Sequence, residues 1–100
     1  MRGGDGSVII KHIADKGEMY DKNRMYARLV IKPGCSIGYH VHENEAEIFY
    51  ILTGAALYSD NGAETELLPG DMALTPSGRG HSIANRGNED LEMMALIVLQ

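Results

Sequence analysis

The sequence predicts an all-β domain, built as a sandwich or a barrel of short strands. Segments rich in β-branched and aromatic residues recur along the 100 residues, and such residues favour strands. Clusters of Gly, Pro and Asn separate these segments at intervals of about eight to twelve residues, which is the spacing of a sandwich or barrel. Apolar spacing compatible with a helix occurs only around residues 14–20. These three observations define the expected class.

The first half of the chain contains four predicted strands, over residues 8–13, 24–32, 36–42 and 47–53. Residues 14–23 between the first two form a polar, loop-like stretch. The second strand alternates regularly, with apolar residues on one face: Met25, Ala27, Leu29 and Ile31. Pro33-Gly34 ends it and favours a type II turn. Glu43-Asn44-Glu45 is expected to turn the chain into the fourth strand.

Five further strands are predicted in the second half, over residues 55–59, 63–68, 71–75, 81–84 and 91–99. Asn61-Gly62 between the first two predicts a tight hairpin, because these residues accept the positive φ values that it requires. Pro69-Gly70 predicts another turn. Residues 1–6 contain three glycines, so we expect a flexible N-terminal arm, with residues 7–100 forming a single domain.

Two of these strands are apolar on both faces. Ile48, Tyr50 and Leu52 lie opposite the side chains that would fill the interior, and residues 91–99 show the same pattern. A monomer would expose the second apolar face unless loops or the N-terminal segment covered it. We therefore expect a homodimer that packs sheet against sheet.

Composition excludes several classes of partner. The chain is 44% hydrophobic and 23% charged, as in an ordinary globular domain. Its formal net charge of −5 disfavours nucleic acid and anionic membranes as partners. No apolar run approaches the roughly 20 residues of a membrane-spanning helix. One cysteine cannot form an internal disulfide, and with no signal peptide this favours a cytoplasmic location.

Three good metal ligands lie within eight residues. His40 and His42 are two positions apart, so on a strand their side chains point to the same face. Glu47 begins the next predicted strand, and a carboxylate there needs a buried partner. Two strands joined by a short turn can present all three to one point. By themselves these residues are equally consistent with polar side chains in a turn.

The segments around these residues resemble the cupin family. The first matches its pattern G-x5-H-x-H-x4-E-x6-G with Gly34, His40, His42, Glu47 and Gly54. The second matches G-x5-P-x-G-x2-H-x3-N with Gly70, Pro76, Gly78, His81 and Asn85. With the spacer at 55–69, the two motifs cover about half of the chain, and every signature position is filled.

The resemblance implies a jelly-roll barrel, or double-stranded β-helix, that holds one divalent transition metal ion. By motif position its ligands would be His40, His42, Glu47 and His81. Three imidazoles and a carboxylate suit Mn, Fe, Ni, Co or Zn. On an octahedral ion they leave two positions for water or substrate. The alternative is a metal-free cupin in which these side chains only form hydrogen bonds.

Six further residues are candidates for binding a small-molecule ligand. Phe49 and Ile51 share the alternation of Glu47 and should form an apolar wall, to which Met72 and Ile83 are candidate additions. Tyr26 and Arg28 share a strand face and could line the pocket, with Arg28 binding a carboxylate. An arginine on the solvent face is the alternative.

Two neighbouring residues are assigned ordinary roles. Glu45 is expected to be a solvated turn residue, although support of a histidine is the alternative. His12 is expected to be a structural histidine, unrelated to the metal ligands.

The resemblance is strongest to small single-domain cupins and to the barrels of oxalate decarboxylase-like proteins. Oxalate decarboxylases carry an arginine three residues before the first histidine of the pair, and here that position is Ile37. The first hypothesis is a metalloenzyme acting on a small carboxylate, keto acid, sugar derivative or phenol, with no general base assigned. The alternative is a non-catalytic module that binds metal and a small ligand. A purely structural metal protein is a third, weaker reading.

Overall fold

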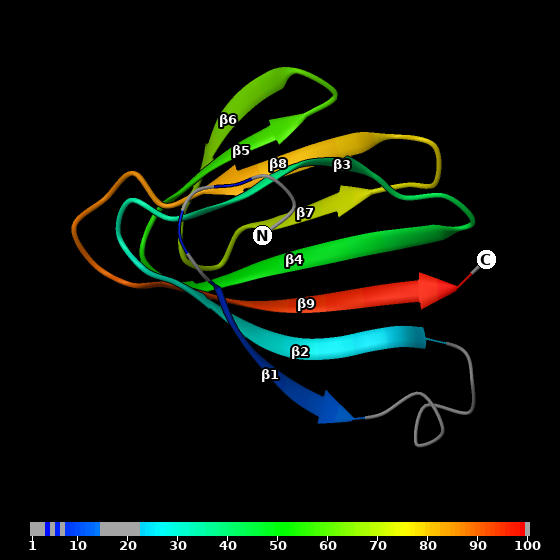
Figure 1. The fold of residues 1–100 in the computed structure, drawn as a ribbon, viewed down its shortest axis with the longest axis horizontal. Coiled ribbons are helices and arrows are strands. Elements are labelled where there is room, and N and C mark those ends of the chain that lie inside the picture. The colour runs from blue at the N-terminus through cyan, green and yellow to red at the C-terminus, as the bar shows by residue number, and fades with distance from the viewer. Residues whose placement is uncertain (1–3, 5, 7, 15–22, 100) are drawn as a thin grey trace.

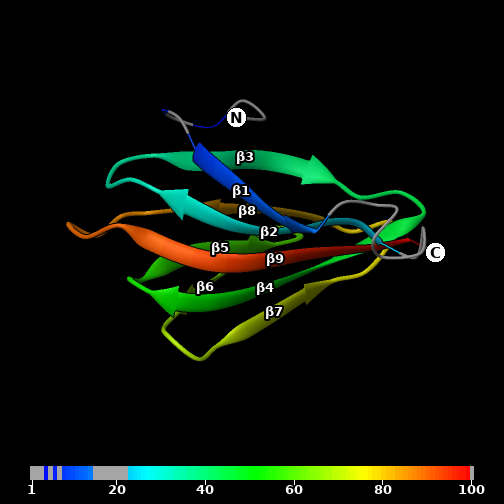
Figure 2. The same cartoon turned by 90° about the horizontal axis from the view of Figure 1, so that it is seen from below.

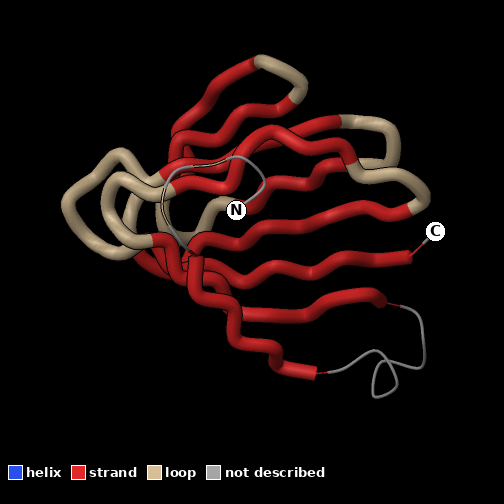
Figure 3. Tube along the Cα trace, in the orientation of Figure 1, coloured by secondary structure: helices blue, strands red, loops and turns tan. Residues whose placement is uncertain are grey.

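The computed structural model describes residues 4, 6, 8–14 and 23–99, and all regular structure in this part of the chain is β-strand. Figure 3 shows strands joined directly by loops. The strands are β1 (Val8–Ala14), β2 (Asn23–Ile31), β3 (Ser36–Val41), β4 (Glu45–Thr53), β5 (Ala56–Asp60), β6 (Ala63–Leu67), β7 (Met72–Thr75), β8 (Gly80–Ala84) and β9 (Leu91–Leu99). The predicted fold class, an all-β jelly roll, is confirmed.

The strands form two antiparallel sheets. One has the order β1-β2-β9-β4-β7 and the other the order β3-β8-β5-β6. Figure 1 separates them, with β6, β5, β8 and β3 in its upper part. In the view from below, β2, β9, β4 and β7 lie in front of β5, β6 and β8. Neighbours such as β9 and β4 are distant in sequence, which is the jelly-roll topology.

One face of each sheet fills the interior. In the larger sheet Ala27, Ala95 and Phe49 occupy one cross-strand row and are at most 2% exposed. Ile37, Tyr58 and Ile83 contribute to the same core from the smaller sheet. Because side chains alternate along a strand, the residues between these point outward. This inner face decides which side chains can reach a site inside the barrel.

The turns follow the predicted chemistry. Asn61 and Gly62 both have positive φ, at 53° and 92°, as the hairpin between β5 and β6 requires. Gly54 is constrained twice: its φ is 86°, and an added Cβ would lie 2.6 Å from the backbone oxygen of Asp90. Asn85, fully buried, donates from its side chain to the carbonyls of Ile31 and Glu89. The loops at this end of the barrel are therefore fixed to the core.

The outer face of the larger sheet is apolar, as the two-sided pattern predicted. Tyr50 and Leu52 of β4 are 45% and 37% exposed. Met72 and Leu74 of neighbouring β7 extend this surface, at 58% and 50% exposed. We call Tyr50, Leu52, Met72 and Leu74 the outer apolar face.

Some expectations concern residues outside the described part of the chain. The helical spacing around residues 14–20 and most of the N-terminal arm fall there. Gly4 is described, and its backbone lies close to that of Ser36. The described residues include no helix of sufficient length and hydrophobicity to traverse a membrane.

Candidate metal centre

Four side chains from three strands and one connection meet inside one end of the barrel. His40 lies near the end of β3, His42 follows directly after that strand, Glu47 lies near the start of β4 and His81 near the start of β8. Their ligand atoms all lie within 4.8 Å of one another. Of the buried polar or charged residues, His42, Glu47, Thr75, His81 and Asn85, three belong to this cluster. The four residues assigned by motif position are brought together.

Backbone pairing explains why they converge. His40 is directly opposite His81 in the β3–β8 ladder. The backbone of His42 continues that ladder, because its oxygen accepts a 2.7 Å hydrogen bond from the nitrogen of Gly78. Asn44, with a φ of 58°, then reverses the chain into β4. The amide nitrogen of Asn44 donates to the hydroxyl of Ser77, which ties together the two loops beside the centre.

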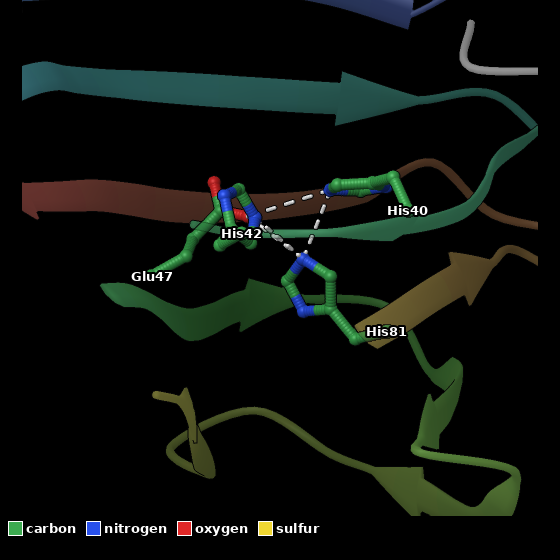
Figure 4. Close-up of side chains that lie close together, drawn as sticks. All are labelled: His40, His42, Glu47 and His81. Atoms are coloured by element: carbon green, nitrogen blue, oxygen red, sulfur yellow. Dashed lines mark hydrogen bonds and ion pairs between the residues drawn. The ribbon is translucent and has the colours of Figure 1, made fainter. Parts of the chain in front are cut away.

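The ligand atoms of the centre are one nitrogen from each imidazole and one carboxylate oxygen. The Nε2 atom of His81 lies 3.0 Å from Nε2 of His40, 3.0 Å from Nε2 of His42 and 2.9 Å from Oε1 of Glu47. Oε1 of Glu47 is also 2.9 Å from Nε2 of His42 and 4.0 Å from Nε2 of His40. Figure 4 shows the three imidazoles and the carboxylate pointing toward this common centre.

Each imidazole is held at its other nitrogen. Nδ1 of His40 lies 2.8 Å from the carbonyl oxygen of Gly38, and Nδ1 of His42 lies 3.0 Å from the carboxylate of Glu45. These partners are acceptors, so both rings carry a proton on Nδ1. Their Nε2 atoms are then free to present lone pairs to the centre, as metal-binding histidines do.

The donor spacing can be tested against known coordination geometry. For ligands about 2.05 Å from an ion, neighbours at right angles are about 2.9 Å apart and opposite ligands about 4.1 Å, whereas a tetrahedron requires about 3.3 Å. The closest pairs here are 2.9–3.0 Å apart, and His40 and Glu47 are 4.0 Å apart. These five of the six donor pairs fit an octahedral arrangement better than a tetrahedral one, and the donor types suit a divalent ion, which would keep two positions for other ligands.

The electrostatics of the centre favour a cation. Burial alone would raise the pKa of Glu47, but hydrogen bonds with His40, His42 and His81 outweigh it and hold that pKa far below its usual value. The hydrogen bond to Glu47 raises the pKa of His42, and burial opposes that rise. When no ion is bound, a proton on His42 therefore supplies the positive charge at the centre.

We expect metal binding to strengthen as the pH rises, since an ion must displace the proton on His42. One displaced proton changes the affinity by about tenfold per pH unit below the pKa of that group. The raised pKa of His42 stabilises the ion-free fold at pH values below the usual pKa of 6.5, and this contribution is lost as the pH rises through the pKa in the folded state. The lowered pKa of Glu47 stabilises the ion-free fold at pH values above the usual pKa of 4.5, and this contribution is lost as the pH falls through the pKa in the folded state.

Melting temperatures with and without Zn²⁺ at pH 5.5, 6.5 and 7.5 measure this dependence. The rise in melting temperature produced by the metal should grow at each step. An increment that stays constant over this range would show that no proton leaves the centre.

Three of the predicted ligand-binding residues lie on the inner face. The ring of Phe49 stacks on the imidazole of His81, with centroids 5.1 Å apart and planes 5° from parallel. Ile51 and Ile83 are 0% and 1% exposed and belong to the hydrophobic core. Phe49 therefore forms a wall of the metal centre, while Ile51 and Ile83 pack deeper in the core.

The other three point away from the centre, which corrects the prediction. Tyr26 and Arg28 alternate with buried Ala27 and so lie on the outer face of β2, where Arg28 pairs with Glu92. Met72 is paired with outward-facing Tyr50 and shares its face. In a jelly roll the core and the pocket share one face of every strand, so residues on the opposite face cannot line the pocket.

Glu45 also differs from its predicted role. It begins β4 instead of ending a turn, and its carboxylate contacts the imidazole of His42. It has the same alternation as Glu47, which was the available signal for this position. His12 is not part of the cluster, as expected.

Sequence reasoning did not identify Tyr58 and Thr75, which lie behind His81. The Thr75 hydroxyl is 2.8 Å and the Tyr58 hydroxyl 3.2 Å from Nδ1 of His81. Thr75 is directly opposite Glu47 in the β4–β7 ladder. Without the strand register, the sequence of a strand as short as β7 does not show which of its side chains point into the barrel.

Comparison with known proteins identifies relatives of the whole chain. Residues 27–98 match the family described as the cupin domain. The oxalate-binding protein of Thermotoga maritima is 48% identical over 99 residues, which are 99% of this chain and 82% of that protein. The crystal structure of a predicted oxalate decarboxylase from the same organism superposes with a TM-score of 0.98 at 47% identity, covering 100% of this chain and 87% of the other.

A more distant structure supports the fold alone. A sugar phosphate isomerase from the cupin superfamily of Silicibacter pomeroyi is 22% identical, with a TM-score of 0.82. The match covers 93% of this chain and 60% of that one. The two chains therefore share the barrel at low sequence identity.

Proposed function

The chain belongs to the cupin domain family, and from this premise we propose that it binds a small chelating carboxylate at a divalent metal ion. His40, His42, Glu47 and His81 would hold the ion. The observation that carries the proposal is the convergence of three Nε2 atoms and one carboxylate oxygen, all within 4.8 Å of one another. When bound, the ion supplies a Lewis-acidic centre that attracts anions.

Oxalate is the first ligand to test. A relative that is 48% identical over 99 residues is named an oxalate-binding protein, and a dicarboxylate of this size can occupy two coordination positions. Phe49, stacked on His81, provides an apolar wall on one side of the centre. The chemistry of the site therefore supports a small, oxygen-rich anion.

A metalloenzyme is the second candidate, supported by the two coordination positions that four protein ligands would leave on an octahedral ion.

One residue argues against the decarboxylation of oxalate as the reaction. The position at which oxalate decarboxylases carry arginine is Ile37, which is 5% exposed and part of the hydrophobic core. Hence that position cannot supply a cation to a bound carboxylate.

Calorimetric titration of oxalate into Mn²⁺-loaded and chelator-treated protein tests the proposal. We expect binding to the loaded protein alone, and acetate, which cannot form the five-membered chelate ring of oxalate, should bind at least about tenfold more weakly. Equal oxalate binding by both forms would refute a metal-centred site. Incubation with ¹³C-oxalate decides between the two candidates: intact oxalate supports a binding protein, whereas ¹³C-formate or ¹³CO₂ would establish an enzyme.

We also propose that the protein is a homodimer that buries the outer apolar face. Four large side chains, Tyr50, Leu52, Met72 and Leu74, are each more than a third exposed on adjacent strands. A self-complementary sheet face is the simplest partner for such a surface. A cytoplasmic location remains part of this proposal and rests on the single cysteine.

Light scattering should give about twice the chain mass of 10.9 kDa. Leu74→Glu places a charge in the interface and should shift the protein to monomer. Leu68→Glu is the matched control, because Leu68 is similarly exposed, at 47%, but follows β6 in the other sheet. A wild-type monomer at micromolar concentration would contradict the dimer.

A further inference from the structure

The three imidazoles of the centre differ in what holds their Nδ1 atoms. His40 contacts a backbone carbonyl, and His42 contacts the carboxylate of Glu45. Both of these partners accept hydrogen bonds and fix one tautomer. His81 contacts the hydroxyls of Thr75 and Tyr58 instead. A hydroxyl can either donate or accept, so these partners are compatible with both tautomers of His81.

These two hydroxyls and the imidazole form a buried cluster. His81 and Thr75 are 0% exposed and Tyr58 is 3% exposed. The hydroxyls of Tyr58 and Thr75 also hydrogen-bond to each other. Thr75 comes from the larger sheet and Tyr58 from the smaller one, so the cluster connects the two sheets behind the candidate ligand.

The ring of His81 has little room to move when the centre gains or loses an ion. Phe49 stacks on it, and the ring of Tyr58 meets it edge-on, with centroids 5.7 Å apart. At its other nitrogen, Nε2 lies within 3.0 Å of two imidazole nitrogens and a carboxylate oxygen. A change at the centre must therefore be accommodated by hydrogen positions, because the heavy atoms are clamped.

We propose that Thr75 and Tyr58 are positioning residues that let His81 exchange tautomers as the centre gains or loses its ion. This inference rests on the proposed metal site. Without an ion, the Nε2–H group of His81 donates to Oε1 of Glu47, and the Thr75 hydroxyl donates to Nδ1. With an ion, Nε2 presents its lone pair to the centre, and Nδ1–H donates to the oxygen of Thr75.

The exchange leaves the charge of the ring unchanged. One proton is lost from Nε2 and one is gained at Nδ1, with water as the carrier. The Thr75 hydroxyl rotates, so that it accepts from Nδ1–H instead of donating to Nδ1. The Tyr58 hydroxyl contacts both the Thr75 hydroxyl and Nδ1 of His81, and it accepts the Thr75 proton when the ion is bound. In the ion-bound arrangement every polar atom of the cluster keeps a hydrogen-bond partner except the Tyr58 proton. In the ion-free arrangement that proton is directed at the oxygen of Thr75.

Zn²⁺ affinity measured for three variants tests the positioning role. Thr75→Val keeps the shape of the side chain but removes the acceptor for Nδ1–H. We expect it to weaken Zn²⁺ binding by about 10- to 100-fold, the range found for residues that support a metal ligand. Thr75→Ser restores a hydroxyl and should bind within about threefold of wild type. Tyr58→Phe should have a smaller effect than Thr75→Val, because its contact with Nδ1 is longer.

Long-range ¹H–¹⁵N spectra provide a readout that a merely structural role would not change. His81 should carry its proton on Nε2 without Zn²⁺ and on Nδ1 with Zn²⁺. The same tautomer in both conditions, or a folded Thr75→Val protein with wild-type affinity, would overturn the inference. If wild-type protein binds no Zn²⁺, Mn²⁺, Fe²⁺, Co²⁺ or Ni²⁺, the proposed function itself fails, so the two failures are distinguishable.

Discussion

His42→Ala is expected to abolish stoichiometric metal binding. The imidazole of His42 is 2% exposed and lies between the carboxylates of Glu45 and Glu47. Loss of a residue that only supports a metal ligand costs about 10- to 100-fold in affinity, so loss of a ligand should cost at least about 100-fold. Mass spectrometry of protein purified without chelators should find about one transition metal ion per wild-type chain and less than a tenth of that in the variant.

His12→Ala is the matched control for this substitution. His12 is an exposed histidine of β1 and lies outside the ligand cluster. Its replacement should leave the metal content at the wild-type level. Equal metal content in wild type and His42→Ala would remove this histidine from the site, and loss of metal in both variants would indicate adventitious binding to histidines.

Removal of the metal should lower the free energy of unfolding by several kcal/mol. An ion that binds only the folded state at about 1,000 times its dissociation constant stabilises that state by about 4 kcal/mol. In a domain of 100 residues, 1 kcal/mol corresponds to about 4–8 °C in melting temperature. Treatment with a chelator at pH 7.5 should therefore lower the melting temperature by about 15–30 °C, as measured by calorimetry.

His42→Ala provides the control for the chelator. Its melting temperature should not change when the chelator is added. A wild-type melting temperature that is unaffected by the chelator would mean that the cluster is held by hydrogen bonds alone. A fall of equal size in both proteins would show that the chelator acts elsewhere.

Much of the fold could be predicted because local signals agree with the final structure. Asn61-Gly62 has the dihedral angles that its sequence predicts, and the alternation in 24–32 correctly identified Ala27, Leu29 and Ile31 as one buried face. The four clustered side chains were also predicted, through the family resemblance. His81 is 34 residues from Glu47 in the chain, and local spacing alone gives no reason to bring them together.

The remaining site residues could not be assigned because they depend on strand register and on which face is interior. Met72 was a candidate for the pocket wall because it lies on the strand before that of His81, but its pairing with Tyr50 directs it outward. Glu45 was assigned to a turn because a polar triplet precedes an apolar strand. In the structure the bend covers residues 43 and 44, so Glu45 lies on the strand with its carboxylate beside His42. For Met72 only long-range pairing contains this information, whereas the alternation shared with Glu47 was the local signal for Glu45.

Anomalous diffraction from crystals of chelator-free protein is the most direct test of the metal centre. Data collected on both sides of the absorption edge of the bound metal identify the element and its position. We expect one anomalous peak per chain, about 2.0–2.2 Å from Nε2 of His40, His42 and His81 and from a carboxylate oxygen of Glu47. Crystals grown with a saturating divalent transition metal that show no peak among these four side chains would contradict the assignment.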